Sequence, residues 1–432
     1  MRRRRFAKAA LALCAILALV LPVACGDEDG AGPGGDVGEL KSEKSRITNP
    51  DVAAGDLAEL AHDNTAFALD LYQVLRDEEG NLLYSPFSIS IALAMTFAGA
   101  RTTTEQAMAD VLHFTLGQQG LHPAFNKLDL ELIDREANPG PDADDGFKLR
   151  IANSIWGQVG FPFESEFLDV LALNYGAGLN LLDFSADPEA CRQTINEWVE
   201  DRTAGKIEDL LPKMSITTLT RLVLTNALYF KAAWNAPFEE KSTAEGDFQL
   251  LEGGTVTTDM MHQVEDLPYG SGDGWEAASL PYDGEQLDMV LIVPADFETY
   301  EAGLTAEGLE AVLGSLSEHS LTLALPKFSF KSGFSLAQTL EDMGMGIAMS
   351  DAADFSGIAD APGLKITDVF HKTFIAVNEA GTEAAAATAV VVGYDSAPPA
   401  ATLTVDRPFL FLIRDIPTGT ILFVGRVLDP TT

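Results

Sequence analysis

The polar residues that most often carry catalysis are present, but their spacing matches no catalytic motif. The chain has 432 residues, and its six histidines are scattered, at His62, His113, His122, His262, His319 and His371. None lies in an HExxH pair or beside a cysteine pair, which argues against a zinc hydrolase. The sequence also lacks a GxSxG nucleophile elbow and a phosphate-binding GxxxxGK loop. We therefore expect no enzymatic activity, no bound metal and no cofactor.

The most informative residues are 379–399, EAGTEAAAATAVVVGYDSAPP, because their local preferences conflict. Residues 383–387 favour a helix, whereas the three valines at 390–392 favour a strand. Gly381 permits unusual backbone dihedrals, and Pro398 ends any regular element. On local grounds, a surface helix followed by a loop remains an alternative to a segment without one settled conformation.

Composition and charge exclude several classes of protein. Apolar residues make up 47% of the chain and charged residues 22%, which is typical of a globular protein. The formal net charge is -37, so the chain repels phosphate backbones and we expect no nucleic-acid partner. Three cysteines are too few for a disulfide framework or a cysteine-rich metal centre.

The N-terminus has the layout of an export signal. Residues 1–24 contain four consecutive arginines, then a short apolar run that Pro22 interrupts. An uncleaved membrane anchor is the alternative, although the run is short for a bilayer span. The residues before Cys25 resemble a bacterial lipobox, which makes Cys25 a candidate for lipidation. Pro22 stands where that pattern usually has leucine, so ordinary cleavage near Ala24 or Gly26 is the other possibility.

Either form of processing predicts a protein that leaves the cytoplasm, extracellular or held in the cell envelope by a lipid. Residues 25–50 are rich in Gly, Asp, Glu and Ser without apolar periodicity, which predicts a flexible acidic tether. We expect Cys191 to be a buried single thiol. If Cys25 is not lipidated, a bridge between these two cysteines is the alternative.

The folded body is expected to occupy residues 51–432 as one domain. Helical spacing covers 57–75, 89–97, 105–112 and 191–211, and the residues at 138–146 read as a surface loop. Apolar runs bounded by turn residues predict strands at 222–230, 288–293, 321–325, 409–413 and 421–424. Helices mostly precede strands, which indicates an α+β fold.

The sequence resembles the serpin family over residues 55–430, in blocks that occur in the same order as in the family. Residues 379–388, EAGTEAAAAT, resemble the hinge of an inhibitory reactive-centre loop. The other blocks are YSPFSI from Tyr84, TNALYFKAAW from Thr225, LPY from Leu280 with 289–294, LPKF from Leu325 with 340–344, DFSG from Asp354, DRPFLF from Asp406, and FVGR from Phe423 with Pro430. The resemblance implies a single serpin domain with three β-sheets, eight to nine helices and a mobile reactive-centre loop.

The resemblance also implies suicide inhibition of serine proteases, and possible inhibition of cysteine proteases. A protease cuts the loop and is held as a covalent acyl-enzyme while the loop inserts into the central sheet. Alternation in the inserted strand would place small or β-branched side chains inward. If Thr382 faces inward, so do Ala384, Ala386, Thr388, Val390 and Val392. Glu383, Ala385 and Ala387 then face outward.

The family pattern places the cleaved bond sixteen residues after the hinge glutamate, Glu379. This predicts Asp395–Ser396 as the reactive bond. Tyr394, one residue earlier, is the alternative and would suit chymotrypsin-like or subtilisin-like proteases.

Two further groups of positions take their roles from the resemblance. Ser85, Ser88, Asn226 and His371 match the polar cluster, called the shutter, that holds the central sheet closed. Trp234 and Lys327 match the breach, where insertion begins. The family's heparin-binding members use a basic helical patch, which is absent from residues 101–135, so we expect no heparin activation. A non-inhibitory serpin fold that binds or stores a ligand is the alternative function.

Overall fold

The computed structural model describes residues 38–137, 147–383 and 398–432. Nine α-helices and two β-sheets are found within these residues, which confirms the predicted α+β fold and its helix number. No helix in the described ranges has the length and apolarity needed to cross a membrane.

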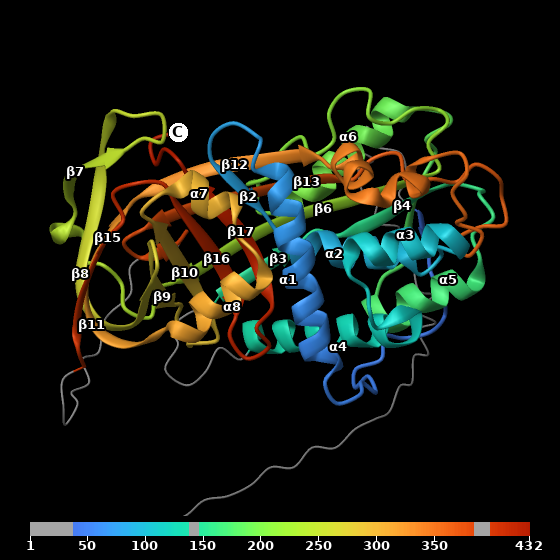
Figure 1. Cartoon of the computed structure of the whole chain (residues 1–432). Coiled ribbons are helices and arrows are strands. Elements are labelled where there is room, and N and C mark those ends of the chain that lie inside the picture. The colour runs from blue at the N-terminus through green and yellow to red at the C-terminus, as the bar shows by residue number, and fades with distance from the viewer. Residues whose placement is uncertain (1–37, 138–146, 384–397) are drawn as a thin grey trace, which may run out of the picture. The chain divides into compact units, whose positions relative to one another are not determined.

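The eight-stranded sheet, called the central sheet below, contains the strands that hold the start of the 379–399 segment (Figure 1). Its strand order is β1-β5-β4-β6-β14-β13-β12, and β3 also pairs with β6. The strands are β1 (Gly38–Leu40), β3 (Phe147–Ile151), β4 (Ser154–Gln158), β5 (Leu179–Leu182), β6 (Leu222–Ala233), β12 (Phe328–Ser335), β13 (Phe370–Asn378) and β14 (Gly381–Thr382).

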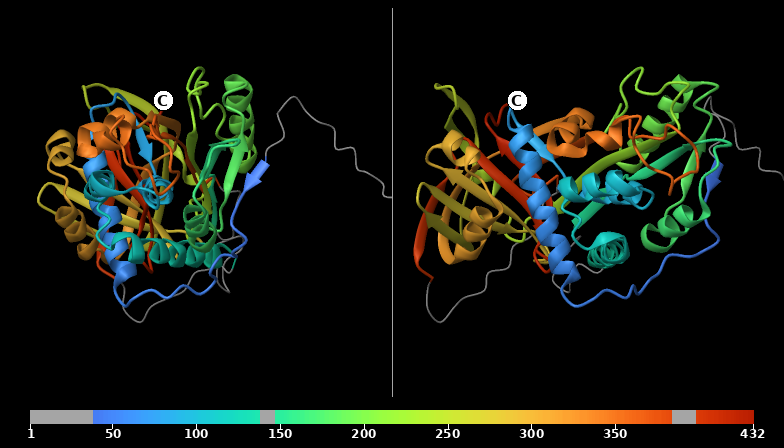
Figure 2. Two further views of the ribbon diagram at one scale, coloured as in Figure 1. Left: turned by 90° about the vertical axis from the view of Figure 1, so that its right-hand side faces the viewer. Right: turned by 45° about the vertical axis from the view of Figure 1, so that its right-hand side comes forward.

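The two faces of the central sheet bury separate apolar clusters. Along β6, Val223 and Ala227 belong to one cluster, and Leu224 and Leu228 belong to the other. This is the two-residue alternation of a strand covered on both faces. Helix α6 (Pro188–Arg202) covers the first face, and Figure 2 shows the other helices near the sheet on the opposite side.

The other helices are α1 (Asp56–Leu75), α2 (Pro86–Phe97), α3 (Thr102–Leu112), α4 (Gly117–Ala137), α5 (Ser165–Val170), α7 (Phe297–Ala302), α8 (Ala306–Ser315) and α9 (Ala337–Leu340). Helix α2 is buried on all sides. Its start is defined by Ser85, whose hydroxyl accepts the Ser88 N–H, and by Pro86 at the first helical position. The predicted helix at 191–211 ends earlier, at Arg202, because Ala204 and Gly205 take left-handed backbone conformations, and residues 203–211 form a linker without regular structure.

The second sheet corrects the expected number of sheets. Three were predicted, but the described strands form only two hydrogen-bonded sheets. The long strand β8 (Thr255–Gly272) is the reason, because it pairs with β7 and β11 and then continues into pairing with β9. It thereby joins two groups of strands into one sheet. The remaining strands are β2 (Leu82–Tyr84), β7 (Ala244–Gln249), β9 (Trp275–Pro281), β10 (Leu287–Pro294), β11 (Ser317–Pro326), β15 (Ala400–Thr404), β16 (Phe409–Asp415) and β17 (Ile421–Val427).

The N-terminal residues 38–50 were predicted to belong to the flexible tether, and for them that prediction is wrong. Strand β1 pairs antiparallel with β5 at the edge of the central sheet. Arg46 then donates to the buried Asn126 amide oxygen at 2.8 Å and pairs with Asp129 at 2.6 Å. The Asn126 amide in turn donates to the carbonyl of Ile47. Sequence periodicity missed this segment because strand addition and ion pairing require no apolar pattern.

We expect Arg46→Ala to lower the free energy of unfolding by about 2 kcal/mol, since it leaves a buried amide oxygen and a carboxylate without their charged donor. Lys41→Ala is the control, because the Lys41–Glu39 pair is solvent-exposed and worth well under about 1 kcal/mol. The measurement is thermal unfolding of both variants at one scan rate. Equal midpoints for the two variants would show that residues 38–50 do not stabilise the body.

Candidate functional site

The start of the segment at 379–399 lies inside the central sheet. Strand β14 is antiparallel to both neighbours, with Thr382 opposite Val377 of β13 and opposite Ala232 of β6. Farther along, β13 and β6 pair with each other directly and in parallel, from Phe370↔Thr225 to Phe374↔Tyr229. The sheet is therefore split by the segment at one end and closed below it.

Gly381 is required by this close approach. Its φ is 147°, and a Cβ atom at this position would lie 2.2 Å from the Ala232 carbonyl oxygen. No side chain fits there without displacing the β6 backbone. The glycine thus permits entry of the segment between the two central strands.

Thr382 follows and points into the protein, where it is 1% exposed. Its hydroxyl lies 2.8 Å from the hydroxyl of Tyr282, which is fully buried. The Tyr282 ring stacks on Trp234 with centroids 4.6 Å apart, and the Trp234 indole N–H donates to the carbonyl of Asn378. Burial raises the pKa of Tyr282 well above its usual range, so the phenol stays protonated. The predicted breach tryptophan is thus one layer away from the inserted threonine.

Glu379, the predicted hinge glutamate, is tied to the second predicted breach residue. Its carboxylate accepts from Lys327 Nζ at 3.2 Å and from the Thr243 hydroxyl at 2.8 Å. Burial alone would raise the pKa of Glu379, but hydrogen bonds from its own backbone N–H, Thr243 and Lys327 outweigh this and lower the pKa. The first residue of the hinge is therefore held at the end of the sheet by its bonds to Lys327 and Thr243.

Glu383 lies on the face opposite Thr382, as alternation requires, but it is not open to solvent. Its carboxylate pairs with Lys206 of the linker after α6, and the Lys206 ammonium also lies 5.2 Å from the centroid of the Phe374 ring. The backbone of Glu383 has φ 56° and its N–H donates to the carbonyl of Ala376. The linker thus holds the outward side of the hinge against the sheet.

The four predicted shutter residues meet in one buried network below β14. Asn226 and His371 are direct register partners on β6 and β13, and the Asn226 amide donates to the hydroxyl of Ser88 at 2.7 Å and to its carbonyl. Asn153 completes the network, since its side-chain oxygen accepts from Asn226 at 2.9 Å and from Ser88 at 3.1 Å.

The contacts of His371 determine its tautomer. The backbone N–H of Ser85 donates to Nε2 at 2.9 Å, so Nε2 carries no proton. Nδ1 then carries the proton and donates to the Asn226 side-chain oxygen. Burial lowers the pKa of His371 to about 3, because a charged ring would be desolvated. The neutral ring bridges the two strands that close the sheet.

Stability should fall as the pH is lowered below neutrality. Burial also lowers the pKa of His122 to about 4. In the unfolded chain both histidines take up a proton near pH 6.5, whereas in the folded chain they stay neutral, so stability is complete above about pH 6.5 and is lost toward pH 3–4. Each contributes a loss of up to about 1.4 kcal/mol per pH unit. The upper part of this window, from pH 7 to pH 5, lies above the usual pKa of Asp and Glu side chains.

The measurement is thermal unfolding at fixed scan rate between pH 7 and pH 5, with wild type and His122→Gln. We expect the variant to keep about half of the wild-type pH dependence, since His371 remains. A variant with no remaining pH dependence would show that His371 is not held neutral by the folded structure.

Several predicted residues lie outside the described residues. These are Cys25, the hinge positions Ala384, Ala385, Ala386, Ala387 and Thr388, and the reactive-bond candidates Tyr394, Asp395 and Ser396. On the far side of this gap the chain enters the second sheet, where β15 pairs in parallel with β11 and the Ser320 N–H donates to the Pro399 carbonyl at 3.0 Å. The segment is therefore fixed in a different sheet at each end.

Sequence reasoning missed three residues of this site. Tyr282 lies in the LPY block, but nothing in the block relates it to Thr382, 100 residues later. Asn153 and Lys206 belong to no recognised block. Each becomes functional only through a contact between distant parts of the chain, so no local signal could have identified it.

Cys191 on α6 is a free, buried thiol, as expected. Burial, and then the nearby Asp187 and Asp183 carboxylates, raise the pKa of Cys191 to about 11. The thiol is thus protonated at neutral pH and a poor nucleophile.

Comparison with known proteins gives a consistent result. The family profile described as Serpin (serine protease inhibitor) matches residues 62–430. An uncharacterized serpin-like protein from Thermococcus kodakarensis is 40% identical over 370 residues, which cover 84% of each chain. The leukocyte elastase inhibitor of Homo sapiens is 36% identical over 87% of this chain and 100% of its own. The crystal structure of maspin superposes with a TM-score of 0.80 at 25% identity, covering 87% of this chain and 100% of maspin.

Proposed function

The chain belongs to the serpin family, and from this premise we propose that it is a suicide-type inhibitor of serine proteases, with cysteine proteases as a second target class. The observation that carries the proposal is the position of β14, which lies between β6 and β13 before any cleavage. The first step of loop insertion is already made in the uncut chain.

Insertion of the rest of the loop would replace one strand pairing by two. At present β13 and β6 pair in parallel below β14. A loop that continued along β14 would pair antiparallel with both strands, as Thr382 already does. Antiparallel ladders are somewhat more stable per residue, and the added strand also satisfies its own backbone groups. The uncut state would then be kinetically trapped, with a more stable state available to it.

The sequence of the loop is compatible with this path. With Thr382 facing inward, the next inward positions are Ala384, Ala386, Thr388, Val390 and Val392, all small or β-branched and none charged. No proline occurs from 379 to 395, so no ladder donor is missing. Fast insertion requires such residues, because a large or charged side chain would have to be buried on the way.

The chemistry belongs to the protease. Its nucleophile attacks the carbonyl carbon of Asp395, or of Tyr394 in the alternative register, and forms an acyl-enzyme while the new N-terminus departs. Insertion of the freed loop then carries the bound protease along the sheet before water reaches the ester. No catalytic group of the inhibitor takes part.

The location and the partner of the protein are proposed from the sequence. We propose export of the chain through the signal at 1–24, with Cys25 as lipidation candidate, and a protease encountered outside the cytoplasm. The partner would be that protease alone, without nucleic acid or heparin. A non-inhibitory binding or storage protein is the alternative, and the small inward residues of the hinge argue against it.

The test is incubation of the signal-free protein with chymotrypsin, subtilisin and an Asp-cleaving protease. Denaturing gels should show a complex that survives denaturant, and mass spectrometry of the released C-terminal peptide should identify cleavage after Asp395 or after Tyr394. Clean cleavage without a complex, extended over a broader protease panel, would contradict the proposal and favour the non-inhibitory alternative.

A further inference from the structure

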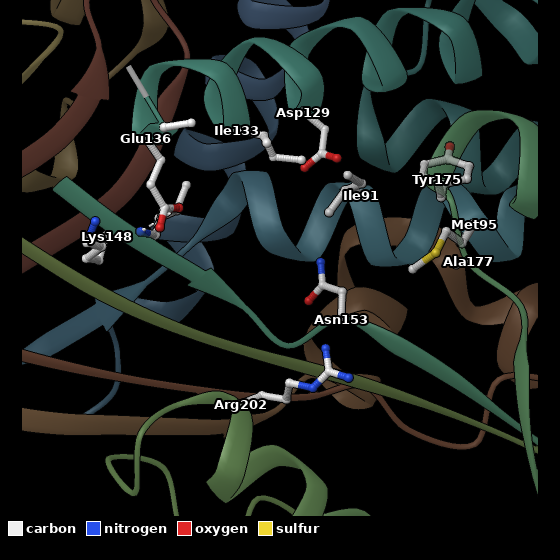
Figure 3. Close-up of a pocket in the computed structure, with 12 residues that line it drawn as sticks. Ile91, Met95, Asp129, Ile133, Glu136, Lys148, Asn153, Tyr175, Ala177 and Arg202 are labelled. Carbon is white, nitrogen blue, oxygen red and sulfur yellow. Dashed lines mark hydrogen bonds between the residues drawn. The ribbon is translucent and has the colours of Figure 1, made fainter. Parts of the chain in front are cut away.

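A cavity of about 610 Å³ lies beside the shutter network (Figure 3). Its walls come from α2, α4 and β3, together with Asn153, residues 175 and 177, and Arg202 at the end of α6. This volume is within the range of small-molecule sites in proteins. None of its lining residues is a predicted hinge, breach or shutter position.

The cavity combines an apolar wall with positive charge. Ile91, Met95 and Ile133 form the apolar part, and Ile133 is 50% exposed at the surface. Arg202 stacks on the Trp198 ring at 4.8 Å, and neither Arg202 nor Lys148 has a carboxylate partner among the described residues.

Both acidic side chains of the cavity have partners. Asp129 is paired with Arg46 at 2.6 Å, and Glu136 accepts the Leu149 backbone N–H at 3.4 Å but keeps its negative charge. Arg202 and Lys148 are therefore the cations that can meet an anionic head, with Glu136 as the opposing charge. Figure 3 shows the Asn153 amide and the Arg202 guanidinium pointing into the cavity from the side opposite Asp129 and Ile133.

We propose that this cavity binds an amphipathic organic anion, whose occupancy holds the central sheet closed. The apolar body would lie against Ile91, Met95 and Ile133, and a carboxylate or sulfonate head would accept hydrogen bonds from Arg202. Arginine suits such a head because its fork of donors matches two anionic oxygens.

Asn153 and strand β3 connect the cavity to the central sheet. Asn153 lines the cavity and also hydrogen-bonds Ser88 and Asn226 of the shutter. The β3 wall pairs with β6 from Phe147↔Ala232 to Ile151↔Leu228, so β3 must move with β6 when β6 separates from β13. A ligand that fits the cavity of the closed sheet disfavours that movement. The binding site is independent of protease inhibition, whereas its effect on loop insertion rests on the proposed function.

The site is tested by calorimetric titration of the signal-free protein with dodecanoate and with 8-anilino-1-naphthalenesulfonate. We expect one saturable site for at least one of these anions and weak binding of dodecyltrimethylammonium, the cation with the same alkyl chain. Arg202→Gln and Ile133→Glu should each weaken the binding about tenfold. Lys213→Gln, at an exposed cation that does not line the cavity, should leave it unchanged. Failure of both anions to bind, equal binding by Arg202→Gln and Lys213→Gln, or equal affinity for the cation would overturn the site.

The effect on the sheet has two readouts. At a ligand concentration 100 times Kd, the thermal midpoint should rise by about 3 °C. Complex formation with a reactive protease should slow by about threefold or more. An unchanged midpoint or an unchanged rate with bound ligand would overturn the closure. If no protease forms a complex even without ligand, the proposed function fails, while the titration and the midpoint still decide the site.

Discussion

Replacing Thr382 by arginine is expected to abolish the proposed inhibition and leave a chain that the protease only cleaves, with a loss of covalent complex of about 100-fold or more. Thr382 is 1% exposed and its hydroxyl is bonded to that of the buried Tyr282. An arginine there must be expelled from the sheet, and the first inserted strand is expelled with it. A protease would then cut the loop and deacylate before insertion traps it.

The measurement is the ratio of covalent complex to cleaved product on denaturing gels. Thr382→Ser is the matched control, because it keeps the hydroxyl bond and should remain an inhibitor. Cleaved wild type should also gain thermal stability through insertion, and cleaved Thr382→Arg should not. Similar midpoints of the uncut proteins would show that the variant is folded, and a normal yield of complex from it would mean that Thr382 does not enter the sheet with the loop.

Replacing Asn226 by alanine should remove the hydrogen bonds that join β6 to β13 and α2 below β14. Asn226 is fully buried and connects Ser88, Asn153 and His371. Without it, the His371 Nδ1–H loses its acceptor in an apolar environment and two strands lose their bridge. We expect a loss of about 3 kcal/mol in the stability of the closed state, which corresponds to spontaneous inactivation faster by up to about 100-fold.

The test is the half-life of inhibitory activity at elevated temperature, together with the thermal midpoint. Asn153→Ala is the matched control, since it leaves the Asn226–His371 and Asn226–Ser88 bonds in place and should cost about 1 kcal/mol. Equal losses in the two variants would show that the closed sheet does not depend on the bridge at Asn226.

Much of the fold followed from local patterns. The apolar runs at 222–230, 288–293 and 409–413 are strands β6, β10 and β16, and the helical spacing at 57–75 is α1. These elements are dictated by periodicity and by turn residues at their ends, both of which are read along the chain. Helix α4 was missed because Gly117, Gly120 and Pro123 weaken the local helix signal, while its buried face is chosen by packing.

The sequence by itself predicted that the hinge can enter a sheet, from glycine at 381 and small uncharged residues at alternate positions. The tertiary structure decided that Thr382 is already inserted over Tyr282, that Lys206 covers Glu383, and that residues 38–50 extend the central sheet. Those outcomes depend on partners that are distant along the chain. Single hydrogen bonds and ion pairs between such partners produce no periodic pattern in the sequence, so they can be identified only in the folded structure.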